Sequence, residues 1–354
     1  MDDTNKLESV LVPLLSIALG LMVGAVMMLA MGYDPIAGYA ALFQGIFGNA
    51  YNFGETLRAW APLVFTGMAV AFAFRTGLFN IGVEGQFIIG SLTAAYVGAA
   101  WNLPPVLHAL VAILAAMVAA GLWASIAGYL KARLQVHEVI TTIMLNYIAM
   151  YTSNYLIRNY FIGHQENTPP IQPSASLEMP ILSQVFDNAR IHWGIFLAIV
   201  FAVLVYWLLF KTTKGYELRA VGFNPFASEY AGMNVQQNIV WSMAISGALA
   251  GVAGSGEVLG VYGYYSIQSG FSGIGFDGIA VALIGNNHPF GILLSALLFG
   301  GLSFGATSMQ RLEDIPFEII RVVIALIIFF VAANMFVKWL IGLFRRRKGQ
   351  VSQQ

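Results

Sequence analysis

Long runs of uncharged, largely apolar residues alternate with short polar segments along almost the whole chain. A transmembrane helix needs about 20 such residues, because each adds about 1.5 Å across a hydrocarbon core about 30 Å thick. Val10–Met31 reaches this length without a charged residue. It is too long for the apolar core of a signal peptide, and no small-residue cleavage site follows it directly. The stretch therefore predicts a first span that is retained in the mature protein.

Further apolar stretches predict nine more spans. They are Ala59–Phe74, Gln86–Ala100, Val106–Leu130, Val139–Ile157, Trp193–Phe210, Asn238–Gly256, Ile267–Asn287, Pro289–Met309 and Val322–Val337. Ile267–Asn287 differs from the others because it is rich in glycine and contains Asp277. The pattern predicts an all-α polytopic membrane protein of about ten transmembrane helices, with one transmembrane domain over residues 1–354.

The composition agrees with a membrane protein and excludes several other classes. Of the 354 residues, 58% are hydrophobic and 10% are charged, whereas a soluble domain carries about 25% charged residues. Seventeen basic residues balance seventeen acidic ones, so no net field attracts a polyanion such as nucleic acid. The chain has no cysteine, which excludes disulfides, thiolate catalysis and Cys-ligated metals. No histidine spacing indicates a metal site, and we expect no catalytic residues.

The positions of lysine and arginine predict the orientation. An even number of spans puts both termini on one side, and with that side cytoplasmic, twelve of the seventeen basic residues are cytoplasmic too. These are Lys6, Arg75, Lys131, Arg133, Lys211, Lys214, Arg219, Lys338, Arg345, Arg346, Arg347 and Lys348. Residues 33–58 and 158–190 are then external loops, and residues 211–237 form a cytoplasmic segment.

These three connecting segments differ in kind. The first external loop contains Pro35–Phe47, a mixed stretch that we expect to form a short helix on the membrane. The second is rich in proline and is either a disordered connection or a docking surface. In the cytoplasmic segment, Asn224 is a good N-cap, Pro225 suits the first helical position and Gly232 suits the position after the end. The pattern predicts a short helix over Phe226–Ala231 that exposes Phe226, Tyr230 and Met233.

Three blocks of sequence resemble a known family. Arg75–Gly90 (RTGLFNIGVEGQFIIG), Arg219–Gly232 (RAVGFNPFASEYAG) and Gly275–Gly291 (GFDGIAVALIGNNHPFG) occur in the family's order. They are similar to the permeases of ABC importers, in the branch that includes ribose, branched-chain amino acid and nucleoside systems. The form of the first block and the chain length resemble the larger permease subunit of nucleoside importers.

The resemblance implies a transport subunit that couples to ATPases in other polypeptides. The chain has no Gly-x-x-x-x-Gly-Lys-Ser/Thr phosphate loop, so ATP is expected to bind to a partner and no cofactor to this chain. Further implied partners are a second related permease, giving a heterodimer, and an external substrate-binding lipoprotein. The coupling residues that the resemblance implies are Gly222, Asn224, Pro225, Phe226, Glu229, Tyr230 and Gly232. The location implied is the cell membrane.

Two acidic residues stand inside predicted spans, where an ionised side chain is costly. Glu84 either lines a pathway or is structural, paired with Arg75 or capping a helix N-terminus. Asp277 either lines a pathway or acts as an N-cap. If spans two to five and seven to ten form an inverted repeat, the spans that carry these residues correspond. Glu84 would then lie near the inner face of the membrane and Asp277 near the outer face.

Other polar and aromatic residues admit two interpretations. Asn146 and Tyr147 lie within a span and either bond between helices or line a water-filled path. Aromatic residues in these blocks either stack on a flat ligand or simply pack, namely Phe79, Tyr147, Phe271 and Phe276. The path candidates are Asn80, Glu84, Gln86, Asn146, Tyr147 and Asp277. Alternative functions are a permease for simple sugars or branched-chain amino acids, or an ion-driven secondary carrier.

Overall fold

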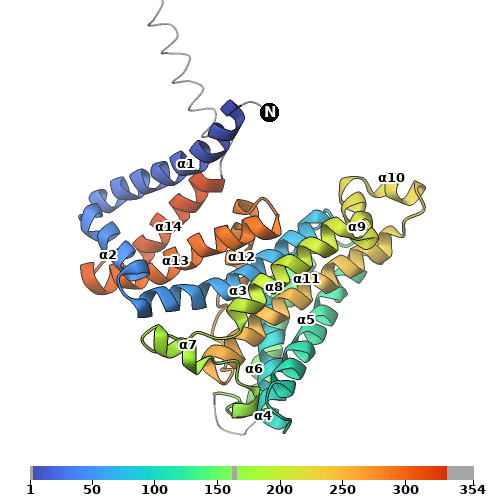
Figure 1. Ribbon diagram of the computed structural model, residues 1–354. Helices are drawn as coiled ribbons and strands as arrows, with labels where there is room; N and C mark the ends of the chain where they lie inside the picture. Colours follow the sequence, from blue (N-terminus) through green and yellow to red (C-terminus); the bar gives the residue numbers. More distant parts are fainter. Residues whose placement is uncertain (1–2, 162–165, 333–354) are drawn as a thin grey trace, which may run out of the picture. The chain divides into compact units, whose positions relative to one another are not determined.

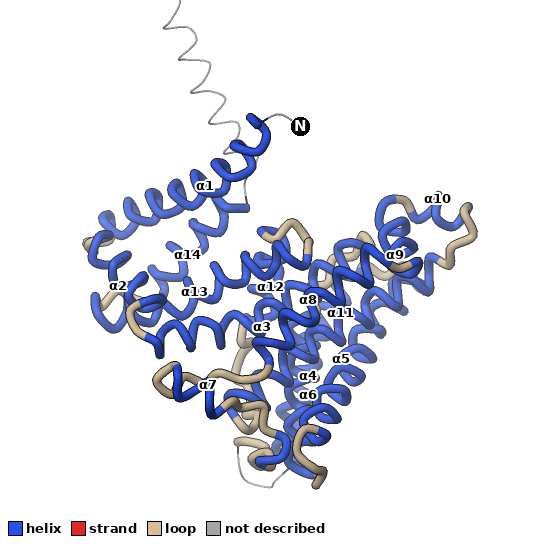
Figure 2. Tube along the Cα trace, viewed as in Figure 1, coloured by secondary structure: helices blue, strands red, loops and turns tan. Residues whose placement is uncertain are grey.

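The computed structural model describes residues 3–161 and 166–332, and for residues 3–14 and 331–332 only the backbone. This part of the chain is helical, with two isolated β-bridges in its loops (Figures 1 and 2). Five of its helices are long and apolar enough to cross a membrane. They are α3 (Ala50–Arg75), α5 (Leu107–Leu134), α8 (Gly194–Lys211), α11 (Val235–Glu257) with its π-helical extension Val258–Tyr262, and α13 (Pro289–Glu313). The protein is therefore an all-α polytopic membrane protein.

Contacts divide the chain into two compact units. The smaller unit comprises residues 1–49 and 302–354. Its described helices are α1 (Asp3–Ala30), α2 (Pro35–Phe47), the end of α13, and α14 (Phe317–Ala332). Helix α2 confirms the short helix predicted in the first external loop, and the Asp34 side chain caps it by accepting from the Ile36 amide at 2.8 Å.

The larger unit comprises residues 50–301. Besides the long helices, it contains α4 (Val83–Ala100), α6 (Glu138–Leu156), α7 (Pro180–Val185), α9 (Thr213–Phe223), α10 (Pro225–Tyr230) and α12 (Ile274–Ile284). A π-helical turn over Ile157–Phe161 and a 3-10 turn over Pro173–Ala175 complete it. All the candidate path and coupling residues belong to this unit.

Helices α4, α5 and α11 pack closely because small residues line their contacts. A Cβ on Gly251 would lie 2.9 Å from the Ala120 side chain of α5, and one on Gly128 would lie 3.0 Å from the Val240 Cα of α11. On the other face of α11, the Gly251 Cα is 2.5 Å from where a Gly90 Cβ would be. Small residues allow this close approach between helices in a membrane, where packing rather than apolar burial drives association. Figure 1 shows α5 and α11 running side by side.

The predicted span Ile267–Asn287 is wrong in its extent. Residues 263–273 form a non-helical segment, and the helix that follows, α12, has only 11 residues. Irregular backbone at membrane depth is tolerated where protein covers it, and an apolar composition does not distinguish such a covered loop from a helix. The predicted first external loop is also shorter than expected, because α3 already begins at Ala50.

Some predictions fall on residues outside the described part of the chain. They include the end of the predicted last span, residues 333–337, and the basic residues Lys338 and Arg345–Lys348. The middle of the second external loop, residues 162–165, lies outside it as well.

Candidate functional site

Glu84 lies at the point where two helices begin. It is in the first turn of α4, fully buried, and its carboxylate reaches the N-terminus of α12. Glu84 Oε1 accepts from the Ser272 hydroxyl at 2.7 Å and from the Gly273 amide at 3.0 Å, and Oε2 accepts from the Gly275 amide at 2.7 Å. The first amides of a helix have no partner within the helix and favour a negative charge. Glu84 therefore caps α12 from a neighbouring helix, one of the structural roles that the sequence left open.

Two glycines make this contact possible. Gly273, the N-cap residue of α12, has φ +86°, which a side chain would resist. Gly275 packs directly on α4, and a Cβ there would lie 2.5 Å from the Glu84 Cα. The expected N-cap role of Asp277 is wrong, because Gly273 holds that position and Asp277 lies in the first turn. The expectation that Glu84 and Asp277 lie at opposite membrane faces is also wrong, since Glu84 bonds to the turn that contains Asp277.

The other end of α12 is bound by Arg75. Arg75 Nε donates to the Asn287 carbonyl oxygen at 2.9 Å, and Nη2 donates to that of Asn286 at 3.2 Å. These carbonyls follow the C-terminus of α12, where a positive charge is favourable. Arg75 therefore does not pair with Glu84. Asn286 and Asn287 form the turn after α12, with both residues in the left-handed region at φ +54° and +50°.

Three buried amide side chains hold the segment before α4. Asn80 donates to Gln86 Oε1 at 3.0 Å and to the Ser246 hydroxyl at 2.8 Å, and its oxygen accepts from Gln86 Nε2 at 3.1 Å. Asn146 donates to the Ile81 carbonyl at 3.0 Å and accepts from the Gly85 amide at 2.8 Å. Buried amides are costly unless bonded, and these are bonded within the protein. The geometry favours bonding between elements, one of the two interpretations given above for Asn146.

Three of the four aromatic residues named above come together. The Tyr147 and Phe271 rings lie 4.9 Å apart, and the Phe271 and Phe276 rings lie 5.6 Å apart, both edge to face. Tyr147 remains 45% exposed. Phe79 instead packs against Phe74, at 5.2 Å. The start of α12 is thus flanked by a partly exposed aromatic group next to the buried Glu84 carboxylate.

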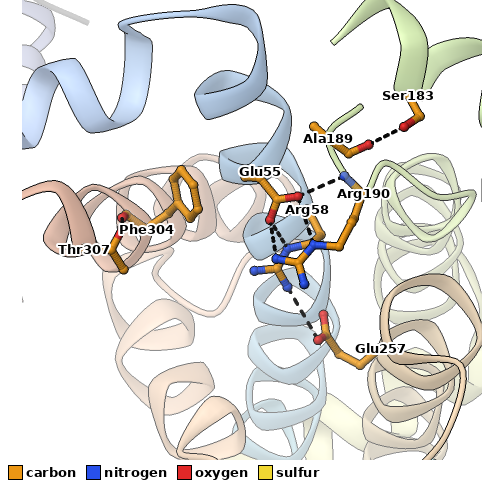
Figure 3. A network of polar contacts seen from close by, with 8 residues as sticks. All are labelled: Glu55, Arg58, Ser183, Ala189, Arg190, Glu257, Phe304 and Thr307. Carbon is orange, nitrogen blue, oxygen red and sulfur yellow. Dashed lines mark hydrogen bonds and ion pairs between the residues drawn. The ribbon is translucent and has the colours of Figure 1, made fainter. Parts of the chain in front are cut away.

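A second cluster of charges connects α3, α11 and the loop before α8 (Figure 3). The sequence analysis did not predict this cluster. The fully buried Glu55 of α3 accepts from Arg58 Nε at 2.8 Å and from Arg190 Nη2 at 2.7 Å. Arg58 Nη1 lies 3.6 Å from Glu257 Oε2 of α11. Glu55 raises the pKa of the Arg190 guanidinium by accepting its hydrogen bonds. The spacing of Glu55 and Arg58 is a helical i, i+3 pair, which was the only signal in the sequence.

The candidate coupling residues lie on α9 and α10 and in the turn that follows α10. Asn224 caps α10 as predicted, its Oδ1 accepting from the Ala227 amide at 3.0 Å, and Gly232 is left-handed at φ +85°. Phe226 is 83% exposed and Tyr230 is 97% exposed, so the expected exposure is confirmed, whereas Met233 is half-buried. Pro225 is the first residue of α10, and Glu229 is exposed on it.

Residues of α9 connect this segment to the end of α3 and to α11. Gly222 of α9 packs against the Arg75 carbonyl oxygen, and a Gly77 Cβ would lie 3.2 Å from the Gly222 carbonyl oxygen. Glu217 accepts from Lys214 Nζ at 3.0 Å and from Asn238 Nδ2 of α11 at 3.2 Å, and these two bonds lower the pKa of Glu217. A groove of about 320 Å³ lies between α9 and α10. A force on α10 would therefore reach both α11 and the Arg75 segment.

Comparison with known proteins identifies the family and several relatives of this chain. Residues 52–333 match the family described as "Branched-chain amino acid transport system / permease component". The chain is 50% identical to the guanosine ABC transporter permease protein NupP of Bacillus subtilis, over 97% of this chain and 99% of NupP. It is 40% identical to the nucleoside ABC transporter permease protein NupB of Lactococcus lactis, over 94% and 93%. It is 29% identical to a second Bacillus subtilis protein, the guanosine ABC transporter permease protein NupQ, over 74% and 84%. No solved structure matches the chain.

Proposed function

This chain belongs to the family of ABC importer permease components that includes branched-chain amino acid systems, and we propose that its substrate is a nucleoside. The observation that carries the proposal is the similarity to NupP, which is 50% identical over nearly the full length of both chains and is named for guanosine. NupB, named for nucleosides, supports the same substrate class at 40% identity. The family as a whole serves several substrates, so the proposal rests on these relatives and not on the fold.

As a permease component, the chain works with an ATPase in another polypeptide. We propose that α10 is the helix that docks on this ATPase. Its two exposed aromatic residues, Phe226 and Tyr230, offer an apolar face that water would otherwise surround. A six-residue helix is too short to be stable alone, and the Asn224 cap and the contacts of α9 hold it in place. The groove between α9 and α10 offers a site for a side chain of the partner.

A second permease completes the proposed membrane unit. Bacillus subtilis has two guanosine permease proteins, NupP and NupQ, and this chain resembles both, NupP more than NupQ. We propose a heterodimer in which this chain is the NupP-like subunit. An external binding lipoprotein delivers the substrate, as the family resemblance implies.

We further propose that both termini are cytoplasmic and that the pathway passes beside the start of α12. From Glu84, α4 runs to the end where Val97 meets His108, and α12 runs to the end where Asn287 meets Arg75. The two helices thus begin together at Glu84, and we propose that they are matching spans of an inverted repeat. Tyr147 and Asp277 are the partly exposed neighbours of this junction. Asn80, Gln86 and Asn146 support it from within.

Replacing Phe226 and Tyr230 together by alanine tests the coupling assignment. The double variant should insert in the membrane as the wild type does, because both side chains are exposed and far from the packed core. It should lose ATPase co-purification and nucleoside uptake. Tyr160→Ala is the matched control, since Tyr160 is a 71% exposed aromatic residue in the π-helical turn Ile157–Phe161. Wild-type uptake and an intact complex in the double variant would refute the role of α10.

A further inference from the structure

A cavity of about 300 Å³ lies beside the Glu84 junction in the larger unit. Phe87 and Ser91 of α4 line one side, and Glu257 and Tyr262, at the end of α11, line the other. Ser272 links the cavity to the junction, because it lines the cavity and also donates to Glu84. The volume is at the lower end of the range for small-molecule sites, which is about 300–1,000 Å³.

Two polar atoms at this cavity have no hydrogen-bond partner among the described residues. They are Ser91 Oγ and Glu257 Oε1, on side chains that are almost fully buried, with residue exposures of 1% and 3%. Glu84, in contrast, which lies two helical turns before Ser91 on α4, accepts three hydrogen bonds. A buried polar atom without a partner costs free energy, so such atoms in a native protein require an explanation. A ligand that donates hydrogen bonds in the cavity provides one.

The other lining residues indicate the shape of that ligand. Four of them are aromatic, namely Phe87, Tyr262, Tyr264 and Tyr265. Flat ring systems pack well against such side chains. A simple cation would be repelled by Arg58, whose Nη1 lies 3.6 Å from the other oxygen of Glu257. The cavity suits a flat heteroaromatic ring with N–H groups on one edge.

We propose that this cavity binds the base of the transported nucleoside, with Glu257 Oε1 accepting a hydrogen bond from a base N–H group. The inference rests on the proposed function and adds the site of base recognition to it. Glu257 is held by Arg58 through its second oxygen, so its free oxygen is fixed in position. Ser91 provides a second polar contact from the opposite helix.

The test compares two substrates in the complete transporter. Guanosine carries N–H groups on its base, whereas purine riboside has none. The measured quantity is the ratio of kcat/KM for guanosine to that for purine riboside, in proteoliposomes. Glu257→Gln should lower this ratio about tenfold, because a neutral amide oxygen accepts a hydrogen bond more weakly than a carboxylate oxygen does. Ser91→Ala should lower it by about threefold. Glu178→Gln, at an exposed external-loop position, should leave it unchanged.

The ratio separates recognition from a general defect. If Glu257 only supports the fold, Glu257→Gln lowers uptake of both nucleosides equally and the ratio stays the same, which overturns the inference. If Glu257→Gln does not assemble, Ser91→Ala decides, because it removes one hydroxyl from the cavity and leaves the charges in place. If the wild type imports neither nucleoside, the proposed function itself fails. If the wild type imports both and neither variant changes the ratio, only the proposed role of the cavity is refuted.

Discussion

Glu84 and Arg75 hold opposite ends of the same short helix. Glu84 accepts from the Gly273 and Gly275 amides at the start of α12, and Arg75 donates to the Asn286 and Asn287 carbonyls that follow its end. Each charge lies at the end of the helix whose dipole it complements. One sequence block, Arg75–Gly90, thus positions a second block, Gly275–Gly291, although the two are far apart along the chain.

Gly275→Ala should disrupt this arrangement. The added Cβ would lie 2.5 Å from the Glu84 Cα, against backbone that cannot move as a flexible side chain can. Overpacking of this kind costs about 1–3 kcal/mol, so the thermal unfolding temperature of the purified complex should fall. Gly270→Ala is the control from the same segment, because nothing lies within 4 Å of its Cβ position. Equal unfolding temperatures for the two variants would contradict the close contact of α4 and α12.

Glu84→Gln should weaken the cap of α12 without changing its size. The amide nitrogen of glutamine cannot accept from a backbone N–H, so one buried donor loses its partner. The free energy of unfolding should fall by about 1–3 kcal/mol.

Asp277→Asn removes a charge next to the junction and leaves the cap intact, so it should lower nucleoside uptake while the complex still assembles. Wild-type uptake by Asp277→Asn would remove Asp277 from the pathway.

The sequence predicted those features that depend on local chemistry. Asn224, Pro225 and Gly232 act within a few residues of one another, and their cap, start and stop appear in the structure as predicted. The long spans follow from uninterrupted apolar composition, which is also local. Such features need no knowledge of the neighbouring helices.

Features that depend on distant residues could not be predicted. Glu55 and Arg190 are 135 residues apart, and nothing in the sequence indicates that they pair. The non-helical segment before α12 has the composition of a span, and only the cover of other helices allows it to stay irregular. The capping role of Glu84 could not be established from the sequence, because it depends on where α12 begins and on its packing against α4. Its cap geometry is now defined, while its part in transport remains a prediction.

Gly232→Val should impair coupling through backbone conformation alone. Gly232 has φ +85°, and nothing lies within 4 Å of its Cβ position, so the added side chain meets no neighbour. A β-branched residue resists this left-handed conformation by about 1–2 kcal/mol. We expect reduced ATPase co-purification at normal membrane insertion. Gly270→Val, also in open space but without a positive φ, should retain ATPase binding. If Gly270→Val lost as much ATPase co-purification as Gly232→Val, the conformational explanation would be contradicted.

His192 makes the stability of the larger unit depend on pH. Burial, with help from the Arg58 charge, lowers the pKa of His192 from 6.5 to about 4. Because the unfolded chain binds this proton more readily, stability is full above pH 6.5 and decreases as the pH falls towards 4. The loss between pH 7 and pH 5 should be about 2 kcal/mol, measured by thermal unfolding. His192→Gln should reduce this pH dependence, and replacement of the exposed His137 should not.

Uptake by the reconstituted transporter tests the central claim most directly. The chain is incorporated into proteoliposomes with its ATPase and the second permease, ATP is enclosed on the ATPase side, and the binding protein is added outside. Labelled guanosine, ribose and leucine are then compared with and without ATP. We predict uptake of guanosine that requires ATP and is not competed by ribose or leucine. Uptake of ribose or leucine in place of guanosine, or guanosine uptake driven by an ion gradient without ATP, would contradict the account.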